Sequence, residues 1–488
     1  MNLIYGIKDK PKFGQMLVFA FQQVLAILAA TILVPVIINN NEAVKAVFPQ
    51  FATGEGMSQA AALFGAGVGT IVYQLFTKFR SPVFLGSSFA FLGSLAAAVA
   101  GATSAAAGFA GIIMGAVFAG LVYVIIAIIV KIAGVNWINK LMPPVVIGPT
   151  VALIGLSLAG NAVSDLNAGK VLIEKITELK VDGTIIDKTA EVFVDGEQMY
   201  LSNMVSAASP YVTLIIGIIT LLSIFVISVY GKKMAKLIPF VLGILIGYVV
   251  ATIFTVIGIY TDNAALQVIN FAAFKDMTIF AVPDFTFLKA IAGIKDINGA
   301  YIATVAVAYV PVAFVVFAEH IADHKNLSTI IDQDLLEDPG LHRTLLGDGI
   351  GSIAGAFFGG CPNTTYGESV GCVAITRNAS IVTITTAAIM CMVISFFGPF
   401  VTFLASIPNC VMGGVCVALY GFIAVSGLKM IQQVNLNAGK NLFVVSAILI
   451  PGIGGLSVSF GDVTLTTIAC ALILGIITNT LLSKGAEE

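Results

Sequence analysis

The sequence predicts an all-α polytopic membrane protein with fourteen transmembrane segments. Of its 488 residues, 58% are hydrophobic and only 10% are charged, and the mean hydropathy is +1.02. Soluble domains carry about a quarter charged residues, so this composition indicates a chain built to lie in lipid. Apolar stretches of about 20 residues, the length that crosses a bilayer as a helix, recur along nearly the whole sequence.

Twelve of the segments are ordinary apolar runs between charged residues or Pro/Gly breaks. In chain order they cover residues 14–38, 57–77, 107–130, 144–161, 209–230, 235–260, 300–323, 342–360, 379–404, 409–427, 441–457 and 462–483. Such runs are typical of transmembrane helices. The first run is too long for the core of a signal peptide, so we expect it to be retained as the first span.

The third and tenth segments, residues 82–100 and 362–376, differ from the other twelve. Each starts with proline and carries glycine and hydroxyl residues in its first half. Because proline donates no backbone hydrogen bond and glycine lets the backbone approach a ligand, we expect a short extended stretch and then a half-length helix in both. Two such helix starts would place free N–H donors and partial positive charge at the middle of the membrane.

The spacing of the broken segments predicts an inverted repeat. They are seven crossings apart, and an odd number of crossings per half makes two inverted 7-span repeats, an arrangement typical of transporter binding sites. Fourteen crossings put both termini on one side, where lysine and arginine fill the short loops, so both termini are predicted to be cytoplasmic. The acidic loop 161–208 then lies outside. Its segments 184–186 and 192–194 predict a small hairpin.

Two acids lie at lipid depth beside these breaks: Glu319 in the eighth segment and Glu368 in the tenth. Carboxylates there are costly, so they usually face a cavity or a bundle core and serve a function. Asp323 follows Glu319 by four residues on the same helix face. Because like charges in a poorly solvated site disfavour joint ionisation, one carboxyl can carry a proton, which makes Glu319 and Asp323 candidates for proton coupling. The alternative for each is a hydrogen-bonded structural acid.

The predicted site suits a flat, amide-bearing ring. A ligand that offers carbonyl oxygens to the free N–H donors and N–H groups to the two glutamates would satisfy every polar partner, and a nucleobase has this chemistry. Phe89, Tyr366 and Tyr420 are available to flank the ring, although each is also a plausible core aromatic.

Other kinds of site find little support. A net charge of -2 without a basic cluster excludes nucleic-acid binding. His320 and His324 lack enough converging ligands for a catalytic zinc, so we expect neither a metal nor another cofactor. The six cysteines indicate apolar packing. A hydrolase would need a nucleophile, a base and an orienting group, and no histidine is near Ser87 or Ser88 in sequence, so we expect no enzyme.

Several motifs carry a family resemblance. They are AEH at 318–320, DLLEDPGLHR at 334–343, PNTTYGE at 362–368, GSSFAF at 86–91 and ATILVP at 30–35. With these motifs, the chain resembles the nucleobase/ascorbate transporter family, also called nucleobase-cation symporter-2. The resemblance covers nearly the whole chain apart from the outer loops.

The resemblance implies a proton-coupled uracil importer that works by alternating access, commonly as a homodimer, in the cell membrane. It implies a core domain from residues 1–140 (spans 1–4) and 263–404 (spans 8–11). A gate domain would consist of residues 141–262 (spans 5–7, with the outer loop 161–208) and 405–488 (spans 12–14). The alternatives are a purine permease of the xanthine type, or an anion transporter of the same architecture, which two acids in the site disfavour. Sodium remains an alternative to the proton.

The resemblance also implies which residues bind the base. Side chains at 319 and 368 would hydrogen-bond it, and backbone at 89 and 367 would meet its carbonyls. The substrate-binding residues are then Glu319, Glu368, Phe89, Gly367, Tyr366, Tyr420 and Ala30. Two positions depart from the family pattern: Asp323 replaces a histidine of the best-known uracil transporter, and Ser369 replaces the usual asparagine. These departures bear on the proton relay and on the supporting hydrogen bonds.

Overall fold

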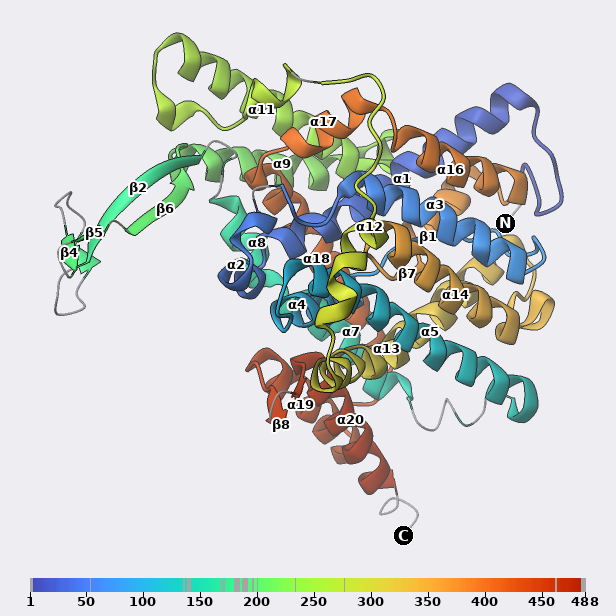
Figure 1. Ribbon diagram of the computed structural model, residues 1–488. Helices are drawn as coiled ribbons and strands as arrows, with labels where there is room; N and C mark the ends of the chain where they lie inside the picture. The colour runs from blue at the N-terminus through green and yellow to red at the C-terminus, as the bar shows by residue number, and fades with distance from the viewer. Residues whose placement is uncertain are drawn as a thin grey trace.

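The computed structural model describes residues 3–483 except 53, 135–136, 138–141, 168, 170–171, 180–184, 187–191, 195–196, 200, 233, 276 and 461–462. Eight helices in this part are long and apolar enough to cross a membrane (Figure 1). They are α1 (Phe13–Asn40), α3 (Gln59–Phe76), α5 (Ala105–Ala133), α7 with α8 (Pro144–Ser157 and Ala159–Leu166), α9 (Pro210–Tyr230), α11 (Pro239–Tyr260), α13 (Gly299–Ile331) and α18 (Asn409–Ile431).

The remaining predicted segments coincide with helices outside this set of eight. These are α4 (Leu92–Ala100), α14 (Leu341–Gly359), α15 (Gly367–Thr376), α16 (Ile381–Ile394), α17 (Gly398–Ser406), α19 (Gly439–Ile453) and α20 (Thr467–Ser483). Short connecting helices are α2 (Glu42–Val47), α10 (Met234–Leu237), α12 (Thr286–Ala290), η1 (Pro49–Phe51), η2 (Phe89–Phe91), η3 (Ala264–Leu266), η4 (Phe271–Phe274), η5 (Ile291–Asp296) and η6 (Leu336–Gly340). The prediction of a mainly helical, multi-pass membrane protein is confirmed.

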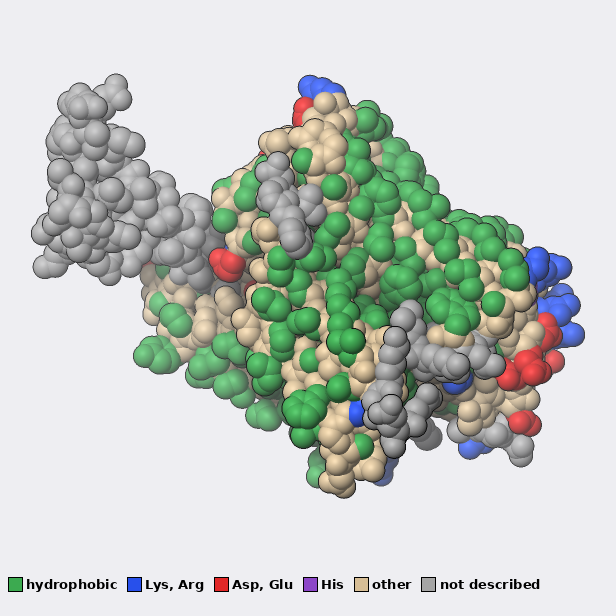
Figure 2. Space-filling view, turned by 90° about the horizontal axis from the view of Figure 1, so that it is seen from below, with side chains coloured by type: hydrophobic (Ala, Val, Ile, Leu, Met, Phe, Trp, Pro, Cys, Tyr) green, Lys and Arg blue, Asp and Glu red, His purple; other side chains and the backbone are tan. Residues whose placement is uncertain are grey.

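The outer surface of the helices is suited to lipid. Large apolar side chains on α9 and α11 are exposed, among them Leu222, Phe225, Val249 and Ile253. Figure 2 shows hydrophobic side chains across the middle of one face, with charged side chains toward its edges. Since a water-soluble protein rarely exposes so wide an apolar band, this surface fits a bilayer.

Inside the helical body, two short strands pair with each other (Figure 1). Strands β1 (Leu85–Ser87) and β7 (Asn363–Thr365) are antiparallel, with Gly86 opposite Thr364, and both are buried. The N–H of Ser88 extends the pair by donating to the carbonyl of Pro362 at 2.9 Å. The predicted extended stretches in the third and tenth segments are confirmed, and they lie side by side.

Helices α3 and α14 hold this strand pair in place. The hydroxyl of Thr70 in α3 accepts the N–H of Leu85 at 2.9 Å, and the amide of Asn363 donates to the carbonyl of Gly65 at 3.1 Å. A side chain at Gly351 or Gly359 of α14 would collide with the backbone of α3. Glycines recur every four residues in this segment, at 347, 351, 355 and 359, and this spacing predicts a close approach of a neighbouring helix. The prediction is confirmed.

The described part of residues 161–208 contains more strands than predicted. Strands β2 (Leu172–Leu179), β3 (Ile185–Ile186) and β6 (Leu201–Ser206) form one sheet in the order β3-β2-β6. Strand β4 (Val192–Val194) pairs with β5 (Glu197–Met199), and β8 (Val458–Phe460) pairs with β9 (Val463–Leu465) near the C-terminus.

The predicted hairpin between 184–186 and 192–194 is wrong in its pairing. Both segments supply strands, but β3 pairs with β2, and β4 pairs with β5. The reason is local, because the sequence between β4 and β5 is Asp-Gly, which favours a tight two-residue turn. Residue 184 and the domain boundary predicted at 140 and 141 lie outside the described residues.

Candidate functional site

The strand pair brings two helix starts together. Strand β1 leads into η2 and α4, and β7 leads through Tyr366 into α15. The first N–H groups of a helix have no partner within that helix, and they carry partial positive charge. Glu368 lies in the first turn of α15, where this charge favours a carboxylate. Two segments far apart in the sequence therefore present polar backbone to one place.

Three predicted carboxylates meet beside the strand pair. Glu319 of α13 interacts electrostatically with both Asp323 and Glu368. Asp323 accepts a hydrogen bond from the hydroxyl of Thr365 in β7 at 2.6 Å, which ties α13 to the strands. All three acids are partly exposed, and Gly367 is exposed, so this side of the site is not closed by other parts of the described chain. A small polar ligand could meet the acids and the helix start of α15 together.

The predicted aromatic residues lie on two sides of the site. Tyr366 is buried and its hydroxyl donates to the carbonyl of Ser87 at 2.7 Å, so it bonds β7 to β1. The rings of Phe89 and Tyr420 meet edge to face, with centroids 6.4 Å apart. Tyr366 thus has a structural bond, while the contact of Phe89 with Tyr420 links the third segment to α18.

Ala30 and Ser369 belong to α1 and α15, two helices that pack against each other. Ala30 is buried within α1, which packs against both β1 and α15. The side-chain amide of Gln23 in α1 donates a hydrogen bond to the hydroxyl of Ser369. The short side chain of Ser369 is therefore part of a bond that connects these two helices, next to Glu368.

Sequence reasoning missed Asp348, which lies behind Glu319. Its Oδ2 lies 2.7 Å from Nδ1 of His320, and both side chains are fully buried. Nε2 of His320 is 3.0 Å from the hydroxyl of Thr344. Asp348 could have been identified in the same way as Glu319, because it too is a carboxylate at lipid depth. The glycines around Asp348 favoured a pure packing interpretation instead.

A second buried histidine extends this network. The rings of His320 and His324 stack with centroids 4.0 Å apart. Nδ1 of His324 lies 2.8 Å from the carbonyl oxygen of His320, which can only accept, so Nδ1 carries the proton. Nε2 lies 2.7 Å from the hydroxyl of Tyr73, and this hydroxyl also forms a hydrogen bond with Ser81. Within the described ranges, no three His, Cys, Asp or Glu side chains are grouped to hold a metal.

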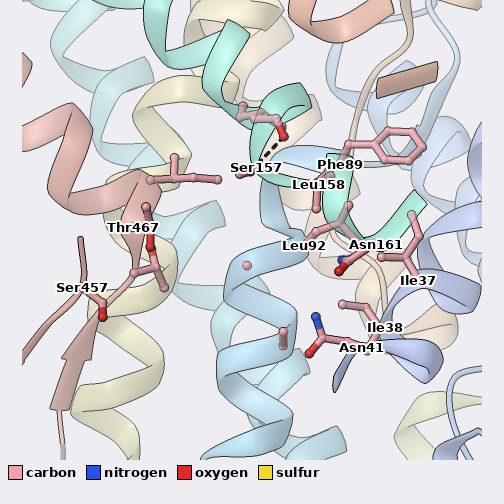
Figure 3. A pocket seen from close by; sticks show the side chains of 15 residues that line it. Ile37, Ile38, Asn41, Phe89, Leu92, Ser157, Leu158, Asn161, Ser457 and Thr467 are labelled. Carbon is pink, nitrogen blue, oxygen red and sulfur yellow. Dashed lines mark hydrogen bonds between the residues drawn. The ribbon is translucent and has the colours of Figure 1, made fainter. Parts of the chain in front are cut away.

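A cavity of about 330 Å³ has Phe89 in its wall (Figure 3). Helices α1, α4, α7, α8 and α20 contribute to its wall, and Asn41 and Asn161 point into it. Among the predicted site residues, Phe89 lines this cavity and the three acids do not. The cavity and the group of carboxylates are therefore lined by different residues.

The sequence matches the profile of a permease family over residues 14–185 and 184–460. A uracil permease of Bacillus subtilis is 34% identical over 99% of this chain and 96% of that protein. A uracil permease of Escherichia coli is 31% identical over 96% of this chain and 92% of that protein. The chain belongs to this permease family. The resemblance seen in the sequence motifs is confirmed, and the family's members are transporters rather than enzymes.

Solved structures of transporters share the fold. The transmembrane domain of the cyanobacterial bicarbonate transporter BicA superposes with a TM-score of 0.56 at 15% identity, covering 97% of this chain and 100% of that one. The murine anion transporter Slc26a9 has a TM-score of 0.61 at 11% identity, covering 98% of this chain and 69% of that one. At these identities the permease shares their architecture, while its chemistry depends on its own side chains.

Proposed function

We propose that this permease imports uracil or a closely related nucleobase across the cell membrane, together with protons, by alternating access. The observation that carries the proposal is the β1–β7 pair, which gathers two helix starts beside Glu319, Asp323 and Glu368. The relatives named uracil permease, similar along nearly the whole chain, support the choice of base.

Uracil has the polar groups that this site would satisfy. The ring is flat and neutral, with two carbonyl oxygens and two N–H groups. The backbone N–H groups at Phe89 and Gly367 would donate to the carbonyls, and Glu368 and Glu319 would accept from the ring N–H groups. Such bonds to charged groups each contribute about 1.5–3 kcal/mol. Tyr366 and Tyr420 would lie against the ring, and Ala30 would line the site from α1.

Glu319 and Asp323 would couple the proton to the base. Three carboxylates within electrostatic reach cannot all be ionised at low cost, so a proton taken up on one side of the membrane would be held with the base. Its release on the other side would free the base. Sodium could bind the same oxygen atoms, and the experiment below distinguishes the two ions.

The proposed architecture has fourteen crossings in two inverted repeats of seven. The core domain would consist of residues 1–140 and 263–404, and the gate domain of residues 141–262 and 405–488. Both termini would be cytoplasmic, and two copies would form a homodimer. The pairing of β1 with β7 supports the repeat, because the two strands belong to corresponding segments of the two halves and run antiparallel.

Uptake by proteoliposomes tests the proposal. We expect labelled uracil to accumulate under an imposed pH gradient, and Glu319→Gln to retain folding but lose this accumulation. Glu42→Gln is the matched control, since Glu42 is an exposed acid paired with Lys45. Normal proton-driven accumulation by Glu319→Gln would refute the coupling role of Glu319. Accumulation by the wild-type protein that needs a sodium gradient would show that sodium, rather than the proton, is the coupling ion.

Competition for uptake separates the remaining alternatives. Xanthine that displaces labelled uracil at lower concentration than uracil itself would indicate a purine permease. Chloride or sulfate currents without base uptake would indicate an anion transporter, the activity named for structures of similar fold. Three acids in the site oppose an anion, because each would repel it.

A further inference from the structure

A cavity of about 250 Å³ lies where α5 ends and α14 begins, away from the proposed transport site. Its walls are of two kinds. Lys131, His342 and Arg343 supply basic groups, and Phe76, Ile128 and Leu346 supply apolar ones. We propose that this cavity binds the headgroup and upper acyl chain of an anionic phospholipid.

The charge of the cavity selects an anion. Lys131 lies in the last turn of α5, and His342 lies in the electrostatic field of both Arg343 and Lys131. No acidic side chain lines the described part of the cavity. Asp338, the acid four residues before His342, bonds Arg80 instead at 2.7 Å. The basic groups are thus available to a phosphate.

The start of α14 adds to this preference. The helix runs for 19 residues from Leu341, and its first turn contains no acidic residue. Free N–H groups and the helix dipole make such a start favourable for a phosphate. Arg343 lies in that first turn, so its side-chain charge and the backbone charge have the same sign there.

The apolar wall favours a lipid over a free phosphate ion. Ile128 is 51% exposed, and it continues a stripe on α5 with Ile125 (56%) and Ile132 (81%). These positions are three and four residues apart, so they share one face of a helix long and apolar enough to cross the membrane. A soluble anion would gain nothing from this face. An acyl chain would lie along it while its headgroup meets Lys131 and Arg343, as in other basic pockets at the membrane surface.

Native mass spectrometry of the full chain in detergent tests the site. We expect phosphatidylglycerol to bind more tightly than phosphatidylcholine with the same acyl chains. The double variant Lys131→Gln with Arg343→Gln should weaken phosphatidylglycerol binding roughly thirtyfold, from two basic groups near the surface. The matched control is Lys78→Gln with Lys325→Gln, which removes the same charge from two exposed positions outside the cavity.

Three results would overturn the proposal. The first is an unchanged lipid preference in the double variant, and the second is an equal loss in the control. The third is full displacement of phosphatidylglycerol by millimolar inorganic phosphate, which would make the cavity a site for soluble anions. If the double variant does not fold, the salt dependence of lipid binding to the wild-type protein still tests the proposal. Its preference for phosphatidylglycerol should disappear at high salt, and a preference that survives would contradict a charge-based site.

Discussion

The β1–η2–α4 unit and the β7–α15 unit have the same backbone plan but different chemistry. Each has a buried three-residue strand followed by a helix, and the two strands pair. The first unit carries no charged residue between Leu85 and Ala100, whereas the second carries Glu368 at its helix start. The two units therefore share a backbone geometry, but only the second one places a charged side chain at its helix start.

The hydroxyl groups of the two strands differ in the same way. Thr365 of β7 bonds the carboxylate of Asp323. The hydroxyl of Ser88, directly after β1, is buried without a partner among the described residues. Because a buried hydroxyl without a partner is costly, this group is available to a ligand or to water. One unit thus supplies charge, and the other supplies a neutral donor.

The largest expected effect comes from removing the charge that distinguishes the units. Glu368→Gln should weaken uracil binding by about tenfold to a hundredfold, since a hydrogen bond to a charged group contributes about 1.5–3 kcal/mol. Equilibrium binding of labelled uracil in detergent measures this loss. Ser88→Ala, in the other unit, is the comparison and should cost less, because the Ser88 hydroxyl could offer the base only a hydrogen bond between neutral groups. Equal losses in both variants would show that the charge is not what separates the two units.

A pair of glycine variants tests the backbone plan itself. A side chain at Gly86 would run into the buried ring of Tyr366, whereas one at Gly367 would meet only Asp323 Oδ1 at 3.8 Å. Gly86→Ala should therefore destabilise the protein by about 1–3 kcal/mol through overpacking. Gly367→Ala should keep its stability and weaken uracil binding, because the new methyl group would take up part of the space of the base.

Thermal unfolding and binding measured on both variants separate these effects. A Gly86→Ala protein as stable as wild type would contradict the close packing of Tyr366 on β1. A Gly367→Ala protein that binds uracil normally would remove the start of α15 from the site.

Much of this arrangement was accessible from local sequence signals. Proline-initiated breaks predicted both extended stretches, and acids at lipid depth predicted that Glu319 and Glu368 would meet. The register that puts Gly86 opposite Thr364 was not predictable, because the strands are more than 270 residues apart and no local preference fixes their alignment. The roles of the site residues stay predictions.

Two further features depended on competing interpretations. Asp348 lies one residue after Gly347, and the glycine spacing around it explained the segment without any charge. Only packing shows that its partner is His320, 28 residues earlier. In the loop 161–208, the short apolar runs predicted strands correctly, but strand propensity does not determine which strands pair.

The smallest expected effect concerns the aromatic edge of the β1 unit. Phe89 faces the cavity on one side and meets Tyr420 on the other, so Phe89→Leu removes a pair contact of about 0.5–1.5 kcal/mol. Uracil affinity should fall about twofold to tenfold, while Tyr420→Phe, which keeps the ring, should preserve the pair. Binding of both variants and of the double variant Phe89→Leu with Tyr420→Leu gives the coupling between the rings. Strictly additive losses would mean that the contact does not contribute to binding, leaving Phe89 to act through its backbone N–H alone.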